Sequence, residues 1–295
     1  MTKNAFISII GRPNVGKSSL LNKLIGEKIA AVSNKPQTTR TKITGVITND
    51  ETQYVFIDTP GFHKAKTKLS EHMIKAVNES ITDIDIVMLV VDCTKKLSES
   101  EKELIDSFRK TKSPAILVIN KIDLIDDKSE LLGIISNYKD LYDFSAVIPT
   151  SALNNDGLDI IMKELDNNAI EGPHYFPDDM LTDQPEKVIA SEIIREKLLT
   201  LLEDEIPHGI AVTIESMKER NDKDLFDISA VIYCERESHK GIVIGKGGSL
   251  LKKVGSLARE DLEKFFQIKV NLQCWVKVKE GWRNREGIIK NFGLS

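Results

Sequence analysis

The fold of this chain is set by the segment Gly11-Arg12-Pro13-Asn14-Val15-Gly16-Lys17-Ser18, which fits the pattern G-x-x-x-x-G-K-[ST]. An apolar run at residues 5–10 precedes the segment, and a helix-like stretch at 17–25 follows its glycines. Glycine lets backbone N–H groups turn toward an anion, and a helix N-terminus adds partial positive charge. The segment therefore predicts a strand, a phosphate-binding loop and a helix that together hold a nucleoside triphosphate.

The residues of this loop have different expected roles. Lys17 is expected to neutralise the β- and γ-phosphates and so to act in catalysis, and the Ser18 hydroxyl to coordinate Mg²⁺. The Asn14 side chain is a candidate for holding a monovalent cation beside the phosphates. We expect nucleotide contacts from the loop and the residue after it, namely Gly11, Arg12, Pro13, Asn14, Val15, Gly16, Lys17, Ser18 and Ser19.

A second motif, Asn120-Lys121-Ile122-Asp123, indicates which base is bound, because it directly follows a predicted buried strand. The Asp123 carboxylate can accept hydrogen bonds from N1–H and N2–H₂ of guanine, whereas adenine would leave it unpaired at a high cost. Asn120 is expected to tie the base-binding loops together, and the Lys121 stem to lie on the base. Ser151 and Ala152 follow the last strand and are expected to present backbone N–H groups to guanine O6.

Two further loops are expected to respond to the γ-phosphate. Asp58 follows a predicted strand and would hold Mg²⁺ through water, while the Gly61 N–H would meet the γ-phosphate. One threonine of the polar segment before the second strand should reach both Mg²⁺ and the γ-phosphate. Thr39 is the prediction, and Thr38 and Thr41 remain alternatives.

Hydrolysis is expected to be slow, because Phe62 follows Gly61 at the position where many GTPases place a glutamine that orients water. A phenylalanine cannot orient water, so the rate would come from Mg²⁺, Lys17 and backbone positioning. The predicted catalytic residues are Lys17, Thr39 and Gly61, and the predicted metal ligands are Ser18, Thr39 and Asp58.

Strands alternate with helices through the first half of the chain, and several apolar runs are almost continuous, as in strands covered on both faces. This order predicts an α/β P-loop GTPase domain with a doubly wound, mainly parallel sheet. The predicted strands lie at 5–10, 43–48, 54–57, 85–91 and 115–119, and the predicted helices at 17–25, 69–79, 99–109 and 129–138.

The pattern changes near residue 170, where Gly172, Pro173 and Pro177 lie among acidic and polar residues. We interpret this stretch as a linker. Beyond it the predicted order is α-β-β-α-α-β with a final helix, which is an α+β layout. The predicted division is a GTPase domain at 1–168, a linker at 169–185 and a second domain at 186–295. The elements expected in the second domain are helices at 188–202 and 249–266, strands at 210–217, 226–234 and 269–278, and two short helices.

Charge is unevenly spread along the 295 residues, whose formal net charge is −4. Residues 240–295 hold 12 Lys and Arg and 5 Asp and Glu, a balance of +7, so the remainder carries −4 − 7 = −11. A basic module on an acidic chain most often binds nucleic acid or an anionic membrane surface.

The composition points to a cytosolic protein. Hydrophobic residues make up 41% of the chain, yet no apolar run reaches the roughly 18 residues that would span a bilayer. The N-terminus lacks the pattern of a signal peptide. Cys93, Cys234 and Cys274 lie far apart in the sequence and are expected to be reduced thiols, mostly buried.

A glycine-rich turn in the basic module is a candidate for binding RNA. It joins two predicted helices, follows the apolar run Ile242-Val243-Ile244 and is followed by two lysines. Glycines at a helix junction let a nucleic-acid backbone approach, lysines meet its phosphates, and an adjoining apolar groove would receive unstacked bases, as in K-homology (KH) domains. The predicted RNA contacts are Gly245, Lys246, Gly247, Gly248, Lys252 and Lys253.

Two tryptophans, Trp275 and Trp282, lie among basic residues near the C-terminus, where they could stack on bases or complete the core. Trp275 falls in a predicted strand, and there we favour a place in the core.

Taken in order, the motifs closely resemble those of the bacterial Era GTPases, over essentially the whole chain. One departure is Ser19, where the family pattern has threonine, and serine keeps the hydroxyl and the backbone N–H. The resemblance is carried by residues 11–18, 36–40, 58–62, 120–123, 150–152, 172–179, 193–197 and 244–248.

The resemblance implies a Ras-like GTPase domain followed by a type II KH domain, with GTP, GDP and Mg²⁺ as ligands. It implies binding to the 3′ end of small-subunit ribosomal RNA during maturation of the 30S subunit, and peripheral contact with the inner face of the cell membrane. It also implies a hydrophobic residue at the position of Phe62 and stimulation by K⁺ through Asn14. We expect a monomer.

Two alternatives remain open from the sequence. One is a signalling GTPase at the membrane surface, whose basic module binds lipid headgroups. The other is a binding module in which the nucleotide site is idle.

Overall fold

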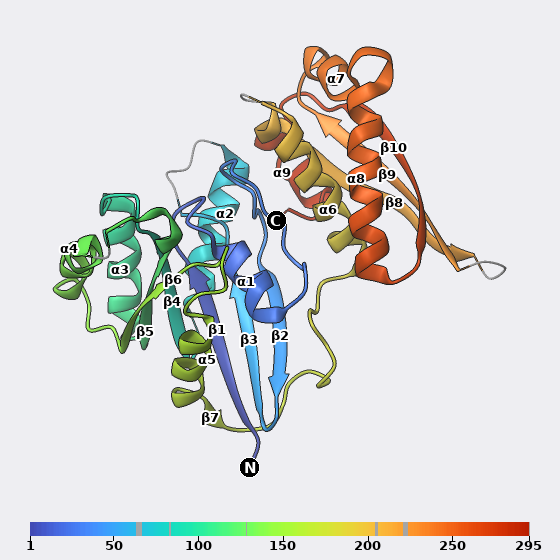
Figure 1. Cartoon of the computed structure of the whole chain (residues 1–295). Helices are drawn as coiled ribbons and strands as arrows, with labels where there is room; N and C mark the ends of the chain where they lie inside the picture. The colour runs from blue at the N-terminus through green and yellow to red at the C-terminus, as the bar shows by residue number, and fades with distance from the viewer. Residues whose placement is uncertain (63–66, 83, 128, 204–205, 221–223, 295) are drawn as a thin grey trace. The chain divides into compact units, whose positions relative to one another are not determined.

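Almost continuous apolar runs form the central strands of a seven-stranded sheet (Figure 1). The strands are β1 (Lys3–Ile10), β2 (Ile43–Asn49), β3 (Thr52–Asp58), β4 (Ile86–Asp92), β5 (Ala115–Asn120), β6 (Ala146–Thr150) and β7 (Ile170–Glu171). Their order is β2-β3-β1-β4-β5-β6, with β7 beside β1. β2 runs antiparallel to β3 and β7 antiparallel to β1, while the other neighbours are parallel. The predicted mainly parallel sheet is confirmed.

Helices cover this sheet. They are α1 (Lys17–Ile25), α2 (Lys68–Glu79), α3 (Glu99–Thr111), α4 (Ser129–Lys139) and α5 (Leu158–Asn167). Side chains of α2, α3 and α4 pack with alternate residues of β4 and β5, among them Leu89 and Leu117. The intervening Val90 and Val118 are equally buried, and α1 packs against β2 and β3 and α5 against β6. Because the sheet is parallel, the loops that follow β1, β3, β4, β5 and β6 meet at its carboxyl edge.

Strand β6, helix α5 and the two-residue strand β7 lie outside the ranges predicted from the sequence. The segment after β7, predicted to be a linker, is fastened along β2 and β3. Gln53 accepts hydrogen bonds from the N–H groups of Tyr175 and Phe176 at 2.8 and 3.0 Å, and the Val46 N–H donates to the Leu181 carbonyl at 2.8 Å. Hydrogen bonds to the Gln53 side chain of β3 and to the backbone of β2 therefore hold this stretch in place.

A second, three-stranded sheet has the order β10-β9-β8, with β9 parallel to β10 and antiparallel to β8. Its elements are α6 (Glu186–Leu201), β8 (Ala211–Arg220), β9 (Leu225–Cys234), α7 (Glu237–Ile244), α8 (Ser249–Phe266), β10 (Lys269–Val278) and α9 (Glu286–Asn291). Apolar side chains of α6, α7 and α8 pack on one face of this sheet. The predicted order α-β-β-α-α-β is confirmed.

The prediction that Trp275 lies in the core is wrong, because its side chain is 58% exposed. Successive residues of a strand point to opposite faces. Val270, Leu272 and Cys274 of β10 pack with the helices, so Trp275 points to the other face. Trp282, after the strand, is fully buried and donates from its ring nitrogen to the Gly209 carbonyl at 2.9 Å.

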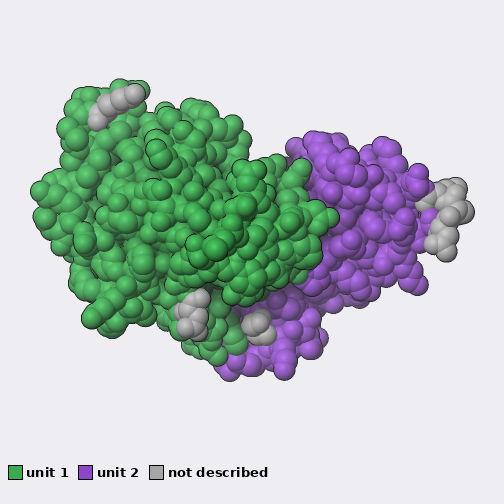
Figure 2. Space-filling model, turned by 90° about the horizontal axis from the view of Figure 1, so that it is seen from below, with its two compact units in different colours: residues 1–29, 39–65, 70–183 green, residues 30–38, 66–69, 184–295 purple. Residues whose placement is uncertain are grey.

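The computed structural model describes residues 1–62, 67–82, 84–127, 129–203, 206–220 and 224–294. The chain divides into two compact units, coloured separately in Figure 2. One holds residues 1–29, 39–65 and 70–183, and the other 30–38, 66–69 and 184–295. The predicted boundaries at 168/169 and 185/186 stay a prediction. None of the helices within the described ranges is both long enough and apolar enough to cross a bilayer.

Candidate functional site

The phosphate-loop motif lies between β1 and α1, where the chain turns through glycines. Gly16 has φ 100° and caps α1, and a Cβ there would come within 2.2 Å of the Asn120 side-chain nitrogen. Gly11 has φ 152°, and a Cβ on it would lie 2.3 Å from the Val90 carbonyl oxygen. Both positions need glycine for conformation and for space.

Lys17 begins α1 and folds back over the loop. Its Nζ donates to the carbonyl oxygens of Gly11 and Arg12 at 3.1 and 3.0 Å. Burial lowers the pKa of Lys17 to about 8, an effect that the Asp58 carboxylate opposes. The ammonium group thus lies against the backbone of the phosphate loop, close to where the motif would place phosphate.

Three oxygen-bearing side chains meet beside this loop. The Ser18 hydroxyl donates to Asp58 Oδ2 at 2.7 Å and lies 2.8 Å from the Thr39 hydroxyl. Thr39 Oγ1 is 3.3 Å from the same carboxylate oxygen. Asp58 is fully buried and its Oδ1 has no hydrogen-bond partner among the described residues. Burial raises the pKa of Asp58, although Lys17 and the two hydroxyls oppose the shift.

This cluster fits a divalent cation. Hydroxyl and carboxylate oxygens are the ligands that Mg²⁺ prefers, and a buried carboxylate with an unmet oxygen is relieved by a positive charge. Of the three candidate threonines, Thr39 is the one placed with Ser18 and Asp58. Thr38 instead donates to the Lys35 carbonyl at 2.7 Å and lies 2.8 Å from the Ser33 hydroxyl.

Gly61 and Phe62 pass close to the phosphate loop. The Phe62 N–H donates to the Gly11 carbonyl at 3.1 Å, and a Cβ on Gly61 would lie 2.6 Å from Pro13. The half-buried Phe62 ring packs against the cluster formed by α2, α3, β4 and β5. A ring held in this way offers no group that could orient a water molecule.

The loops after β5 and β6 are tied to the phosphate loop through Asn120. Its Nδ2 donates to the Val15 carbonyl at 2.8 Å, and its Oδ1 accepts from the Ala152 N–H at 3.1 Å. The Ser151 hydroxyl donates to Asp123 Oδ1 at 2.5 Å. Hydrogen bonds thus join the loop after β5 to the loop after β6 at two points, Asn120 with Ala152 and Asp123 with Ser151.

Lys121 has a partner that the sequence interpretation missed. Its Nζ donates to Asp92 Oδ2 at 2.7 Å and to the Asn14 carbonyl at 2.6 Å. Burial opposes ionisation of Asp92, but hydrogen bonds from Lys121 and Thr94 hold its pKa below the usual value. Asp92 ends a buried apolar strand just as Asp58 does, and that shared pattern could have revealed it.

The glycine-rich turn of the second unit joins α7 to α8, as predicted. Gly245, Gly247 and Gly248 have φ of 75°, 60° and 79°, and a Cβ on either of the last two would meet nothing within 4 Å. Lys246, Lys252 and Lys253 are exposed. The turn therefore offers open backbone and cationic side chains at one place.

A groove of about 490 Å³ adjoins this turn. Apolar parts of Leu251 and Leu272 share it with Arg259, which the sequence interpretation did not name. The other lining residues are Gly248, Lys252, Gly255, Ser256 and Cys274. A groove lined by both apolar and cationic side chains suits bases and phosphates.

Comparisons with known proteins agree with this layout. Residues 6–121 match a family model described as 50S ribosome-binding GTPase, and residues 205–283 match the KH domain model. The chain is 54% identical to GTPase Era of Clostridioides difficile (strain 630) over 295 residues, covering 100% of this chain and 99% of that protein. This chain belongs to the Era GTPase family.

Another Era relative and two solved structures are also similar to this chain over nearly its full length. GTPase Era of Ruminiclostridium cellulolyticum is 53% identical over 291 residues, covering 99% of this chain and 97% of the relative. A crystal structure of Era in complex with MgGDPNP and nucleotides 1506–1542 of 16S ribosomal RNA is 36% identical, with a TM-score of 0.96 and full coverage of both chains. A variant of Aquifex aeolicus Era bound to GDP and aluminium fluoride gives the same values. As an Era family member the chain is a GTPase, with a P-loop domain and a KH domain.

Proposed function

We propose that this Era family GTPase is a GTP-dependent switch that binds the 3′ end of small-subunit ribosomal RNA and acts in maturation of the 30S subunit. The proposal is carried by the presence, in one chain, of the guanine-nucleotide loops and of an open KH turn beside a groove. It is supported by the full-length likeness to Era in complex with 16S ribosomal RNA and a GTP analogue.

In this proposal the triphosphate lies on residues 11–18, and Lys17 neutralises its β- and γ-phosphates. Ser18 and Thr39 would hold Mg²⁺ directly and Asp58 through water. An ion held by these residues would supply positive charge against the negative charge that develops during phosphoryl transfer. The unmet Asp58 Oδ1 supports this assignment, and the Gly61 N–H would meet the γ-phosphate.

Guanine would be recognised by the hydrogen-bonded group around Asn120. Asp123 would accept from the base N1–H and N2–H₂, and the loop at Ser151 and Ala152 would donate to O6. Lys121 reaches across the phosphate loop to the Asn14 carbonyl, which supports the proposal that its stem lies against the base.

We propose that hydrolysis is slow, because Phe62, whose half-buried ring packs against the core, stands in place of a side chain that orients water. Stimulation by K⁺ through Asn14 belongs to the same proposal. A cytoplasmic location, a monomeric state and peripheral contact with the inner face of the membrane also remain predictions.

Capture of cellular RNA on the GTP-analogue-loaded protein, followed by sequencing, tests the RNA role. The wild type should enrich the 3′ end of small-subunit ribosomal RNA, and a Lys252→Glu, Lys253→Glu double variant should lose the enrichment through charge repulsion. The matched control reverses two exposed lysines of the first unit, Lys110→Glu and Lys139→Glu, and should keep it. Absence of enrichment in the wild type, with binding to anionic vesicles instead, would support the rival lipid-binding function.

A GTPase assay on Lys17→Ala against the wild type tests whether the nucleotide site is active. Loss of the ammonium group should reduce turnover by at least a hundredfold, since a positioned charge of this kind contributes several kcal/mol to a phosphoryl-transfer barrier. Equal rates in the two proteins would mean that the hydrolysis comes from elsewhere.

A further inference from the structure

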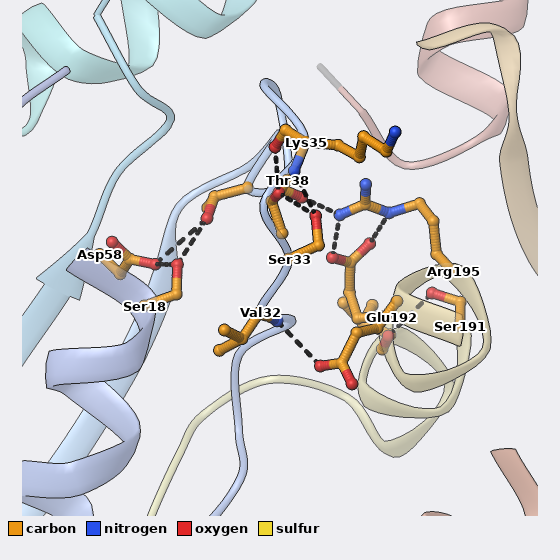
Figure 3. Close-up of polar contacts among 12 residues, drawn as sticks. Ser18, Val32, Ser33, Lys35, Thr38, Asp58, Ser191, Glu192 and Arg195 are labelled. Carbon is orange, nitrogen blue, oxygen red and sulfur yellow. Dashed lines mark hydrogen bonds and ion pairs between the residues drawn. The ribbon is translucent and has the colours of Figure 1, made fainter. Parts of the chain in front are cut away.

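Residues 30–38 and helix α6 belong to the same unit, although residue 38 and the start of α6 at Glu186 are 148 positions apart in sequence. The next residue along the chain, Thr39, belongs to the first unit and lies with Ser18 and Asp58. Figure 3 shows the contacts of Thr39 with Ser18 and Asp58, the contacts of residues 32–38 with α6, and the short stretch of backbone between them. Thr38 and Thr39 are consecutive residues, and the Thr38 carbonyl belongs to the peptide group that joins them. A contact that fixes this carbonyl therefore restricts the position of Thr39.

The segment has an internal structure of its own. The Lys35 N–H donates to the Ser33 hydroxyl at 3.1 Å, and Thr38 closes the loop onto Ser33 and the Lys35 carbonyl at 2.8 and 2.7 Å. These hydrogen bonds make residues 33–38 a small folded loop.

Arg195 of α6 holds one end of this loop. Its guanidinium donates to the Thr38 carbonyl and is paired with Glu192 one turn earlier on the helix. The Arg195 side chain is 2% exposed, so this hydrogen bond from a charged group is shielded from water and strong. One of its nitrogens, Nη1, is buried without a partner among the described residues.

Glu196, the next residue of α6, holds the other end. Its Oε2 accepts from the Val32 N–H at 2.8 Å, and its side chain is 7% exposed. Its second oxygen is 3.0 Å from Lys197 Nζ, which also pairs with Asp261 of α8. Three consecutive residues of α6 thus connect residues 32–38 to the helix that begins after the glycine-rich turn.

We propose that Arg195 and Glu196 are positioning residues of the GTPase switch, which fix residues 32–38 on α6 and thereby set where Thr39 stands. This inference rests on the proposed role of Thr39 at Mg²⁺ and the γ-phosphate. Because coupling between sites is reciprocal, a nucleotide that draws Thr39 toward Mg²⁺ changes the free energy of both contacts on α6. The nucleotide state is thereby transmitted to the unit that carries the KH turn.

The test compares affinities for GDP and for a non-hydrolysable GTP analogue, each with Mg²⁺, in matched variants of the full chain. Glu196→Gln keeps an oxygen that accepts from the Val32 N–H, whereas Glu196→Met removes it, and Arg195→Met removes the donor to Thr38. Lys187→Met changes an exposed residue of the same helix and serves as the control.

Glu196→Met and Arg195→Met should weaken binding of the GTP analogue about tenfold, because they remove one charged hydrogen bond that orients Thr39, and should leave GDP affinity unchanged. Glu196→Gln and Lys187→Met should keep the wild-type ratio of the two affinities. General destabilisation would lower the melting temperature without changing that ratio.

The inference would be overturned if the Glu196→Met and Arg195→Met variants still bound GDP and kept the wild-type ratio of GTP-analogue affinity to GDP affinity. Thr39→Ala separates this failure from failure of the proposed function. If Thr39→Ala lowers GTP-analogue affinity while the α6 variants do not, only the role of α6 is wrong. If Thr39→Ala has no effect either, the assignment of Thr39 to the Mg²⁺ site is wrong, and the inference fails with it.

Discussion

Lys17 and Asp58 show what burial does to charged side chains in this protein. Both are almost completely enclosed, and burial lowers the pKa of the lysine to about 8 and raises that of the carboxyl group. Water no longer stabilises either charge, so each depends on a partner. Phosphate and a divalent cation would supply those partners, which is the residue-scale reason that the site suits a magnesium nucleotide.

The pKa of Lys17 predicts that nucleotide affinity decreases as pH rises above about 8. Phosphate binds the protonated amine and raises its pKa, so binding is at full strength below pH 8. Above pH 8, Lys17 must take up a proton when the nucleotide binds. The nucleotide affinity therefore falls by up to about tenfold per pH unit until the pKa of Lys17 in the bound state is reached. Fluorescent-nucleotide titrations from pH 6.5 to 8.5 measure this slope.

Lys17→Met is the control for this dependence. It should bind nucleotide weakly at every pH, and its affinity should not vary in the same range. A wild-type affinity that stays constant to pH 8.5 would contradict the assignment of the slope to Lys17.

The position of a residue along strand β10 determines whether its side chain is buried or exposed. Helices cover one face of its sheet, so residues at alternate positions are enclosed or reach solvent. Trp275 is exposed on β10, whereas Trp282, beyond the strand end, is enclosed and contacts Phe292 edge-on at 5.3 Å between ring centroids. Two tryptophans seven positions apart therefore make very different contributions to stability.

Urea unfolding of two alanine variants would measure this difference. Trp282→Ala should lower the free energy of unfolding by about 3–5 kcal/mol, because it leaves a cavity and removes a buried hydrogen bond. Trp275→Ala should change it by about 0.5 kcal/mol or less, as expected at an exposed position. Comparable losses in the two variants would mean that the outer face of β10 is covered.

Across the whole molecule, charge is divided between an acidic majority and a basic C-terminal region. Residues 240–295 carry +7 and the rest −11. The exposed Lys246, Lys252 and Lys253 lie at the turn and groove that we propose for RNA. Binding there would displace counterions from the RNA, which makes the affinity dependent on salt.

We therefore expect RNA affinity to fall by roughly sevenfold to fiftyfold between 50 and 200 mM salt, as expected for two to four phosphate contacts on a single strand. Filter binding of an oligonucleotide from the 3′ end of small-subunit ribosomal RNA would measure the slope. Lys252→Glu should reduce both the affinity and the slope, whereas Lys110→Glu should alter neither. An affinity independent of salt would argue against phosphate contacts at the KH turn.

Much of the fold and of the site could be predicted from local patterns. The helix Ser249–Phe266 and the strand Lys269–Val278 have the predicted ends, because periodicity and flanking glycines act over a few residues. The phosphate loop, the Asn-Lys-x-Asp motif and the glycine-rich turn are also local, since each needs certain residue types at fixed spacing. The pairing of Lys121 with Asp92 was not predicted, because it depends on which strands lie side by side.

The chemistry of the loops, the order of the elements and membership of a nucleotide-binding class follow from neighbouring residues and are therefore encoded locally. Three features depend instead on long-range packing: which face of β10 is covered, that Thr39 rather than Thr38 joins Ser18 and Asp58, and that residues 30–38 pack with α6. The Arg195 contact with Thr38 joins residues 157 positions apart. Such contacts arise when apolar surfaces are buried and the remaining polar groups must find partners, and no local pattern specifies the partner.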